Sequence, residues 1–87
     1  MQRRDVEIGI AQGLNARAST RLVQVAASYL SNVSVSRSGR KVNAKSLMGV
    51  MMLAAGPGAR IVVETEGPDE TQALEAIVAL LESGAAP

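Results

Sequence analysis

The sequence predicts a small α+β domain in which three helices cover one face of a four-stranded antiparallel sheet. Segments that alternate with a period of two are interspersed with segments of helical spacing along the 87 residues, in the order βαββαβα. The connections are short, and short connections with right-handed crossovers favour one sheet with its helices on one face. No linker, repeat or low-complexity tract interrupts this order, so we expect a single domain over residues 1–87.

The first two elements are a strand and a helix. Apolar residues alternate with other residues over 6–10, which indicates a half-buried strand. Gly13 then marks a turn, and Asn15 is a strong candidate for the N-cap of the helix that follows. The expected apolar stripe of this helix consists of Leu22, Val25, Ala26, Tyr29 and Leu30.

A hairpin and a short helix are predicted in the middle of the chain. Residues 33–35 alternate as a strand, Ser38-Gly39 is typical of a tight hairpin turn, and Arg40–Asn43 returns as a third strand. Ser46 has the character of an N-cap for a short helix from Leu47 to about Leu53.

The last part of the chain predicts a turn, a fourth strand and a third helix. Residues 56–58 (Gly-Pro-Gly) end the preceding segment, and residues 61–65 form a strand. Asp69 and Gln72 resemble a capping box at the start of the final helix, and residues 84–87 form a frayed tail. The buried stripe of this helix consists of Leu74, Ile77, Val78 and Leu81.

Two residue types that carry much of protein chemistry are missing, because the sequence contains no Cys and no His. Their absence excludes disulfides, thiolate chemistry, Cys-ligated metals and phosphohistidine, and it removes the usual general base and metal ligand. We therefore expect no metal site, no cofactor and no enzymatic turnover by this chain alone.

Aromatic and apolar patterning argues against two further classes of protein. Tyr29 is the only aromatic residue and lies outside the predicted strands, whereas RNA-recognition folds stack bases on strand aromatics. No apolar stretch reaches the roughly 18 residues that a membrane span needs, and no signal-peptide pattern follows the N-terminus. We expect binding to neither nucleic acid nor membrane, and a cytoplasmic location.

Charge is unevenly distributed along a chain whose formal net charge is only +1. All nine basic residues lie within the first 60 residues, whereas the remaining 27 contain six acidic residues and no basic one. Such polarity indicates a basic face suited to an acidic partner or a phosphate. The alternative is that the charges only cover the solvent side.

Two segments of the sequence are more specific than the rest, namely Gly13–Ser19 (GLNARAS) and Val42–Met51 (VNAKSLMGVM). They resemble the HPr family, the small phosphocarriers of the bacterial phosphoenolpyruvate-dependent sugar phosphotransferase system. The element order agrees with that family over essentially the whole chain. The resemblance implies an open-faced β-sandwich with a four-stranded antiparallel sheet and three helices.

Members of that family take a phosphoryl group on a histidine just before the first helix, and Asn15 stands at the corresponding position here. An amide nitrogen is not basic, so the resemblance implies that the phosphocarrier reaction is lost in this chain. Arg17 matches the family arginine that contacts the phosphoryl group. Together with the free backbone N–H groups at the start of the helix, including that of Ala16, it would retain an anion site.

The origin of Asn15 stays open between three interpretations. The chain could be a natural regulator that has lost the carrier role, as in the catabolite-repression HPr of bacilli. It could instead be an engineered or designed phosphocarrier scaffold, or a point mutant that traps the unphosphorylated state. In the last two cases it has no independent cellular role.

Ser46 corresponds to the second phosphorylation site of the family, where an HPr kinase modifies a serine for carbon-source regulation. The structural alternative is that Ser46 only caps a helix, and the two roles are compatible. A phosphate there would add about −1.5 to −2 charges at a helix N-terminus, which tolerates negative charge. We hypothesise that Ser46 is a regulatory phosphorylation site.

The second predicted helix also carries a candidate docking surface. The family binds its partners through a patch that corresponds to Leu47, Met48 and Met51, with Thr20 and Arg21 nearby. Core packing is the alternative, but so short a helix cannot easily bury so many large apolar side chains. The resemblance implies as partners enzyme I and sugar permease domains, or an HPr kinase and a transcription regulator.

Overall fold

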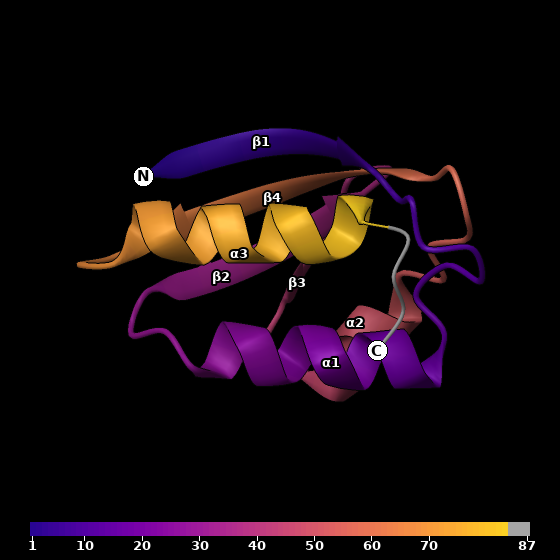
Figure 1. The fold of residues 1–87 in the computed structure, drawn as a ribbon, viewed down its shortest axis with the longest axis horizontal. Helices are drawn as coiled ribbons and strands as arrows, with labels where there is room; N and C mark the ends of the chain where they lie inside the picture. Colours follow the sequence, from indigo (N-terminus) through magenta and orange to yellow (C-terminus); the bar gives the residue numbers. More distant parts are fainter. Residues whose placement is uncertain (84–87) are drawn as a thin grey trace.

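The computed structural model describes residues 1–83, and the predicted tail at residues 84–87 lies outside the described residues. Within the described residues the elements follow the predicted order βαββαβα (Figure 1). They are β1 (Gln2–Glu7), α1 (Ala16–Ala27), β2 (Asn32–Arg37), β3 (Arg40–Asn43), α2 (Leu47–Met52), β4 (Arg60–Glu66) and α3 (Glu70–Glu82). Within residues 1–83, no helix is both long enough and apolar enough to cross a membrane.

The four strands form one antiparallel sheet with the order β1-β4-β2-β3, which confirms the predicted fold class. Strand β4 lies inside the sheet, where Ile61 pairs with Val6 of β1 and Val63 pairs with Val35 of β2. Helix α3 lies along β1 and β4, whereas α1 and α2 lie side by side away from that edge (Figure 1). The arrangement leaves the other face of the sheet open.

The core is built from aliphatic side chains. Strand β1, which contributes to it, ends earlier than the sequence pattern predicts. Strand β1 ends at Glu7, yet Ile8 and Ile10 are both buried. The chain beyond β1 stays tethered because Ile8 N–H donates to the Ala59 carbonyl at 2.9 Å. The alternation over residues 6–10 therefore predicted burial correctly but placed the strand several residues too late.

Helix α1 ends at Ala27, so the predicted stripe of this helix is wrong at its far end. Ser28 caps the helix, Tyr29 is only partly buried, and Leu30 is 81% exposed. Once the chain leaves the helix, the 3.6-residue period no longer determines which side chains face the core. Leu22 and the other buried residues of the helix occupy the turns before this point.

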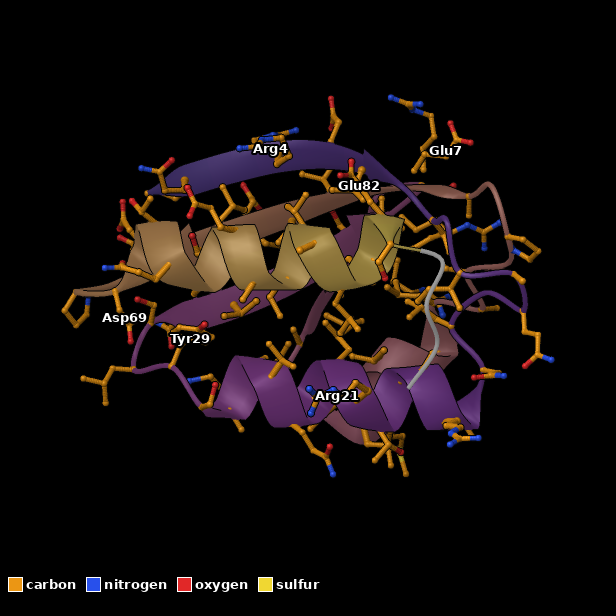
Figure 2. The ribbon with its side chains drawn as sticks, viewed as in Figure 1. Arg4, Glu7, Arg21, Tyr29, Asp69 and Glu82 are labelled. Carbon is orange, nitrogen blue, oxygen red and sulfur yellow. The ribbon has the colours of Figure 1, made fainter. Side chains whose placement is uncertain are left out.

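The predicted capping box of α3 is also wrong. Asp69 is the N-cap residue, but its side chain makes no capping hydrogen bond, and Gln72 is exposed. The Asp69 carboxylate instead accepts hydrogen bonds from Leu30 N–H at 3.0 Å, from Ser31 N–H at 2.9 Å and from the Ser31 hydroxyl. Figure 2 shows Asp69 at the same end of the molecule as Tyr29, where this contact joins two loops.

The β2–β3 hairpin confirms its predicted turn and determines which side chains face the helices. Ser38 and Gly39 have φ values of 51° and 84°, as a two-residue turn that follows the right-handed strand twist requires. Arg37 pairs with Arg40 across the hairpin, and both belong to the side of the sheet that the helices cover. The neighbouring Lys41 points to the open face, where it meets Glu64.

Candidate docking face

The N-terminus of α1 is held by a close approach of two loops. Leu14 N–H donates to the Ala55 carbonyl at 2.8 Å. Gly13 has a φ of 70°, and a Cβ atom at this position would lie 2.7 Å from the Ala55 oxygen, so only glycine fits without a shift of the backbone. This contact fixes the position from which Asn15 starts the helix.

Asn15 caps α1 as predicted. Its backbone is extended, with φ −71° and ψ −177°, and its Oδ1 atom accepts a hydrogen bond from Ala18 N–H at 2.9 Å. Its Nδ2 atom donates to Oε1 of Gln12, also at 2.9 Å. Both ends of the amide are thus engaged, and the N-cap satisfies one of the free N–H groups of the first turn.

The residues after the cap form an exposed polar ridge on α1. Ala16, Arg17, Thr20 and Arg21 are all exposed, and the Thr20 hydroxyl donates to the Ala16 carbonyl at 2.8 Å. Arg17, Thr20, Arg21 and Gln24 line one shallow groove of ≈300 Å³ because helical spacing brings them to one side. Within residues 1–83, neither Arg17 nor Arg21 forms an ion pair.

Helix α2 begins at the predicted N-cap and ends at Met52, one residue before the predicted end. Ser46 is extended, with φ −110° and ψ 113°, and its Oγ accepts a hydrogen bond from Gly49 N–H at 3.2 Å. Val50 is the only buried residue of the helix. Leu53 is the C-cap and is itself buried.

The large side chains of α2 therefore face solvent. The exposed fraction is 42% for Leu47, 75% for Met48, 44% for Met51 and 57% for Met52. These four side chains line one open hollow of ≈600 Å³. Large apolar side chains gathered on one exposed face make this surface a candidate interaction site. Leu47, Met48 and Met51 are the residues that the sequence predicted to be exposed here, and Met52 joins them in lining the hollow.

Basic side chains hold α2 in place at both ends. Lys45 Nζ, just before the helix, donates to the Tyr29 carbonyl at 2.9 Å and so ties α2 to the end of α1. At the other end, Arg37 Nη1 donates to the carbonyls of Leu53 at 2.9 Å and of Ala54 at 3.3 Å. Cationic groups at a helix C-terminus stabilise the helix dipole, so Arg37 has a clear structural role.

On the open face of the sheet, in contrast, three basic side chains form ion pairs with acidic residues. Glu64 lies between Lys41, at 2.8 Å, and Arg3, at 3.6 Å, while Arg60 pairs with Glu7 at 3.4 Å. The hydrogen bond from Lys41 lowers the pKa of the Glu64 carboxyl below its ordinary value. The basic side chains on α1 and beside α2, by comparison, form no ion pair within residues 1–83. Among residues 1–83, no group of His, Cys, Asp or Glu could hold a metal ion.

Comparison with known proteins assigns the family. A family model described as "PTS HPr component phosphorylation site" matches residues 2–83. The chain is 53% identical to the phosphocarrier protein HPr of Cupriavidus necator, over 93% of this chain and 91% of that protein. It is 44% identical to the HPr-like protein Crh of Halalkalibacterium halodurans, over 94% of this chain and 98% of that protein.

Solved structures agree with this assignment. The crystal structure of a phosphocarrier protein HPr from Bacillus anthracis superposes with a TM-score of 0.90 at 39% identity, covering 92% of this chain and 95% of that one. The Bacillus subtilis protein Crh, solved as a swapped dimer, superposes with a TM-score of 0.78 at 37% identity, covering 100% of both chains.

The fold and the sequence together define a small α+β carrier-type domain of the phosphotransferase system. The chain belongs to the HPr family. Proteins of this family carry phosphate between proteins of the phosphotransferase system and are not enzymes. The predicted family and fold are thus confirmed, and the relatives include both phosphocarriers and Crh proteins.

The residues predicted to bind partners come from two helices that contact each other. Thr20 and Arg21 lie on the exposed side of α1, and the apolar side chains of α2 lie on the neighbouring helix. Arg37 and Arg40 were not among the predicted site residues, and the structure places both beside the end of α2. The hairpin turn at Ser38-Gly39 was the available signal, because the register it sets pairs these arginines on the helix side.

Proposed function

We propose that this chain is a regulatory HPr-like protein of the phosphotransferase system that binds partner proteins but carries no phosphohistidine. The exposed apolar side chains of α2, next to a first helix that begins at Asn15, are the observation that carries this proposal. The face formed by α1 and α2 is the part of the molecule that meets the partners. We place its action in the cytoplasm, where the family works.

The loss of the carrier reaction follows from the chemistry at Asn15. Phosphohistidine needs a ring nitrogen with a free lone pair, and the sequence contains no histidine. The Asn15 amide nitrogen has no such lone pair, and it already donates to Gln12. We propose that Asn15 stands where the phosphocarriers have their phospho-accepting histidine, and that the cap keeps the helix start intact.

The groups that would hold an anion remain available. Arg17 is exposed in the first turn of α1, and its guanidinium is not committed to a carboxylate within residues 1–83. The backbone N–H of Ala16 belongs to the positive end of the helix. We propose that these two groups bind acidic or phosphorylated side chains of a partner in place of a phosphohistidine.

Binding itself is assigned to the apolar side chains of α2 and the polar ridge of α1. Leu47, Met48 and Met51 form the apolar contact, with Thr20 and Arg21 at its edge. Such a composition, with an apolar centre and a charged edge, is typical of protein interfaces. The proposed partners are enzyme I and sugar permease domains, or an HPr kinase and a transcription regulator.

Ser46 is the proposed site of regulation. Transfer of the γ-phosphoryl group of ATP to its Oγ would release the hydroxyl proton and place a dianion at the N-cap of α2. The next two residues are Leu47 and Met48, so the charge would appear at the border of the apolar contact. Incubation with HPr kinase and ATP should add one phosphate mass, and Ser46→Ala should abolish it. No mass gain on the unmodified chain would refute this site.

Phosphoryl uptake tests the proposed loss of the carrier role. The chain and Asn15→His are each incubated with phosphoenolpyruvate and enzyme I and are analysed by intact mass. We expect only the histidine variant to gain a phosphate. Uptake by the unmodified chain would overturn the chemical argument, and uptake by neither would show that the face no longer engages enzyme I.

A further inference from the structure

The β2–β3 hairpin brings two arginines to the far end of α2. Arg37 Nη1 lies 2.9 Å from the Leu53 carbonyl oxygen, and Arg40 Nη1 lies 3.5 Å from that of Met52. Both side chains line a hollow of ≈320 Å³ between the hairpin and the helix end. Met52 lines this hollow and also the apolar one on α2, so the two hollows lie on either side of one side chain.

The contacts that Arg37 and Arg40 make with α2 leave the positive charge of both side chains available to a partner. The partners are neutral backbone carbonyls, and each bond uses only one of the three guanidinium nitrogens. Within residues 1–83, neither Arg37 nor Arg40 forms an ion pair. A guanidinium has five N–H donors, so Arg37 and Arg40 can each still bind a carboxylate through two parallel hydrogen bonds.

We propose that Arg37 and Arg40 form a second basic border of the docking face. The partner is a protein surface whose apolar ridge is flanked by carboxylates on both sides. Helix α2 contacts both α1, which carries the exposed Arg17 and Arg21, and β3, which begins at Arg40, while Met52 of α2 lines the same hollow as the two hairpin arginines. This inference deepens the proposed function and rests on it.

Charge complementarity selects an acidic protein over a second copy of this chain. Two copies meeting through α2 would bring the unpaired arginines of both faces together, and like charges across an interface oppose association. The acidic side chains of this chain lie elsewhere, on β1, β4 and α3 and at the start of α3. Several of them, including Glu64 and Asp69, are already engaged in internal contacts.

The test measures binding to purified enzyme I of Cupriavidus necator, whose own HPr is 53% identical to this chain. Arg40→Gln is the main variant because its 3.5 Å contact contributes little to α2. Arg4→Gln is the matched control. It removes the same charge from an exposed arginine on β1, on the opposite side of the molecule from α1 and Arg21 (Figure 2).

We expect Arg40→Gln to raise the Kd by about two- to fivefold at low salt, mainly through slower association. The Kd of this variant should also change less with salt concentration than that of the unmodified chain. Arg37→Gln should have an effect at least as large, and circular dichroism checks that α2 survives. Arg4→Gln should change the Kd less than either. Arg17→Gln reports separately on the first border of the docking face.

The outcomes separate this inference from the proposed function. If Arg17→Gln weakens binding while Arg40→Gln matches Arg4→Gln, the second border is refuted and the proposed function stands. If the unmodified chain does not bind enzyme I, the proposed docking to enzyme I fails and the inference fails with it. If the chain dimerises through this face at the concentrations used, the acidic-partner assignment is wrong.

Discussion

Helices α2 and α3 are both rich in aliphatic residues, but they place them in different surroundings. Over its 13 residues, α3 buries one continuous stripe that consists of Ala73, Leu74, Ile77, Val78 and Leu81. Over its six residues, α2 buries Val50 alone. The two helices therefore differ in where their apolar side chains lie, in the core for α3 and mostly in solvent for α2.

The difference follows from what each helix contacts. Helix α3 packs along β1 and β4, whereas α2 contacts α1 and the short edge strand β3 (Figure 1). A six-residue helix has less than two full turns, so one residue is enough to anchor it. Its remaining side chains stay in water, where apolar groups are costly unless a partner covers them. The contrast separates apolar residues that stabilise the fold from those that we propose bind a partner.

The largest expected effect is on stability and comes from α3. Ile77 is fully buried, so Ile77→Ala should lower the free energy of unfolding by about 3 kcal/mol. Met52→Ala should change it by less than about 0.5 kcal/mol, because Met52 is 57% exposed. Urea denaturation measures both. If Ile77→Ala does not fold, Ile77→Val at about 1 kcal/mol replaces it. Equal effects of the Ile77 and Met52 variants would contradict the contrast.

Binding to enzyme I, unlike stability, should depend on the exposed side chains of α2. Met48→Ala should weaken binding to enzyme I by about tenfold, or 1.4 kcal/mol, because a large contact side chain is lost. Its thermal midpoint should stay close to that of the unmodified chain. Leu30→Ala is the matched control, since Leu30 is 81% exposed and Met48 is 75% exposed, but Leu30 lies in the loop after α1. A similar loss for both would show that exposure alone, and not the docking face, determines the effect.

Loss of the N-cap of α1 should lower the stability of the protein. Asn15→Ala removes the acceptor for Ala18 N–H and should lower the free energy of unfolding by about 1 kcal/mol. Asn15→Asp keeps an acceptor oxygen and should remain within about 0.5 kcal/mol of the parent. Thermal unfolding compares the two variants. An Asn15→Ala protein as stable as the parent would show that the cap contributes nothing.

A gain in stability, smaller in size than the losses above, is expected from a substitution at the end of α2. Ala54 has a φ of 50°, a left-handed conformation that a Cβ atom disfavours. Ala54→Gly should therefore raise the free energy of unfolding by about 0.5–1 kcal/mol. The same change at Ala79, exposed within α3, should lower it by about 1 kcal/mol. Opposite signs in urea denaturation would confirm the strain, and a loss at both positions would refute it.

The smallest expected effect is the share of the pH dependence of stability that comes from the Asp69 loop contact, which replaces the capping box. The hydrogen bond from the Ser31 hydroxyl, followed by that from Leu30 N–H, lowers the pKa of Asp69 below its ordinary value of 3.8. Because the folded pKa lies below the unfolded one, this stabilisation is present above about pH 4 and is lost as the pH falls through the folded pKa. Thermal midpoints between pH 6 and pH 2.5 should fall more for the parent than for Asp69→Asn. Parallel curves would contradict the linkage.

Local signals predicted much of the fold. Asn15 and Ser46 cap their helices, and Ser38-Gly39 closes its hairpin, because each depends on neighbours within a few residues. Asp69 was misassigned because its partner Ser31 lies 38 residues away in the sequence. A tertiary hydrogen bond competes with the local cap, and no sequence window of helical length contains both groups.

In the candidate site, too, local features were predictable from the sequence and tertiary ones were not. The exposure of Met48 and its neighbours was predictable because too many large apolar residues crowd a short helix, whereas their predicted docking role came from the resemblance to the HPr family. Arg37 and Arg40 were missed because their place beside Met52 depends on how the hairpin packs against the end of α2. Sequence spacing alone relates residues within an element, whereas this border of the face joins two elements.

A chemical-shift map most directly tests the claim that the face formed by α1 and α2 is the binding surface. The ¹⁵N-labelled chain is titrated with enzyme I of Cupriavidus necator, and the backbone amide shifts are followed. We expect shifts at the start of α1, over α2 and at the tip of the β2–β3 hairpin. Shifts centred on α3 or on the open face of the sheet would contradict it.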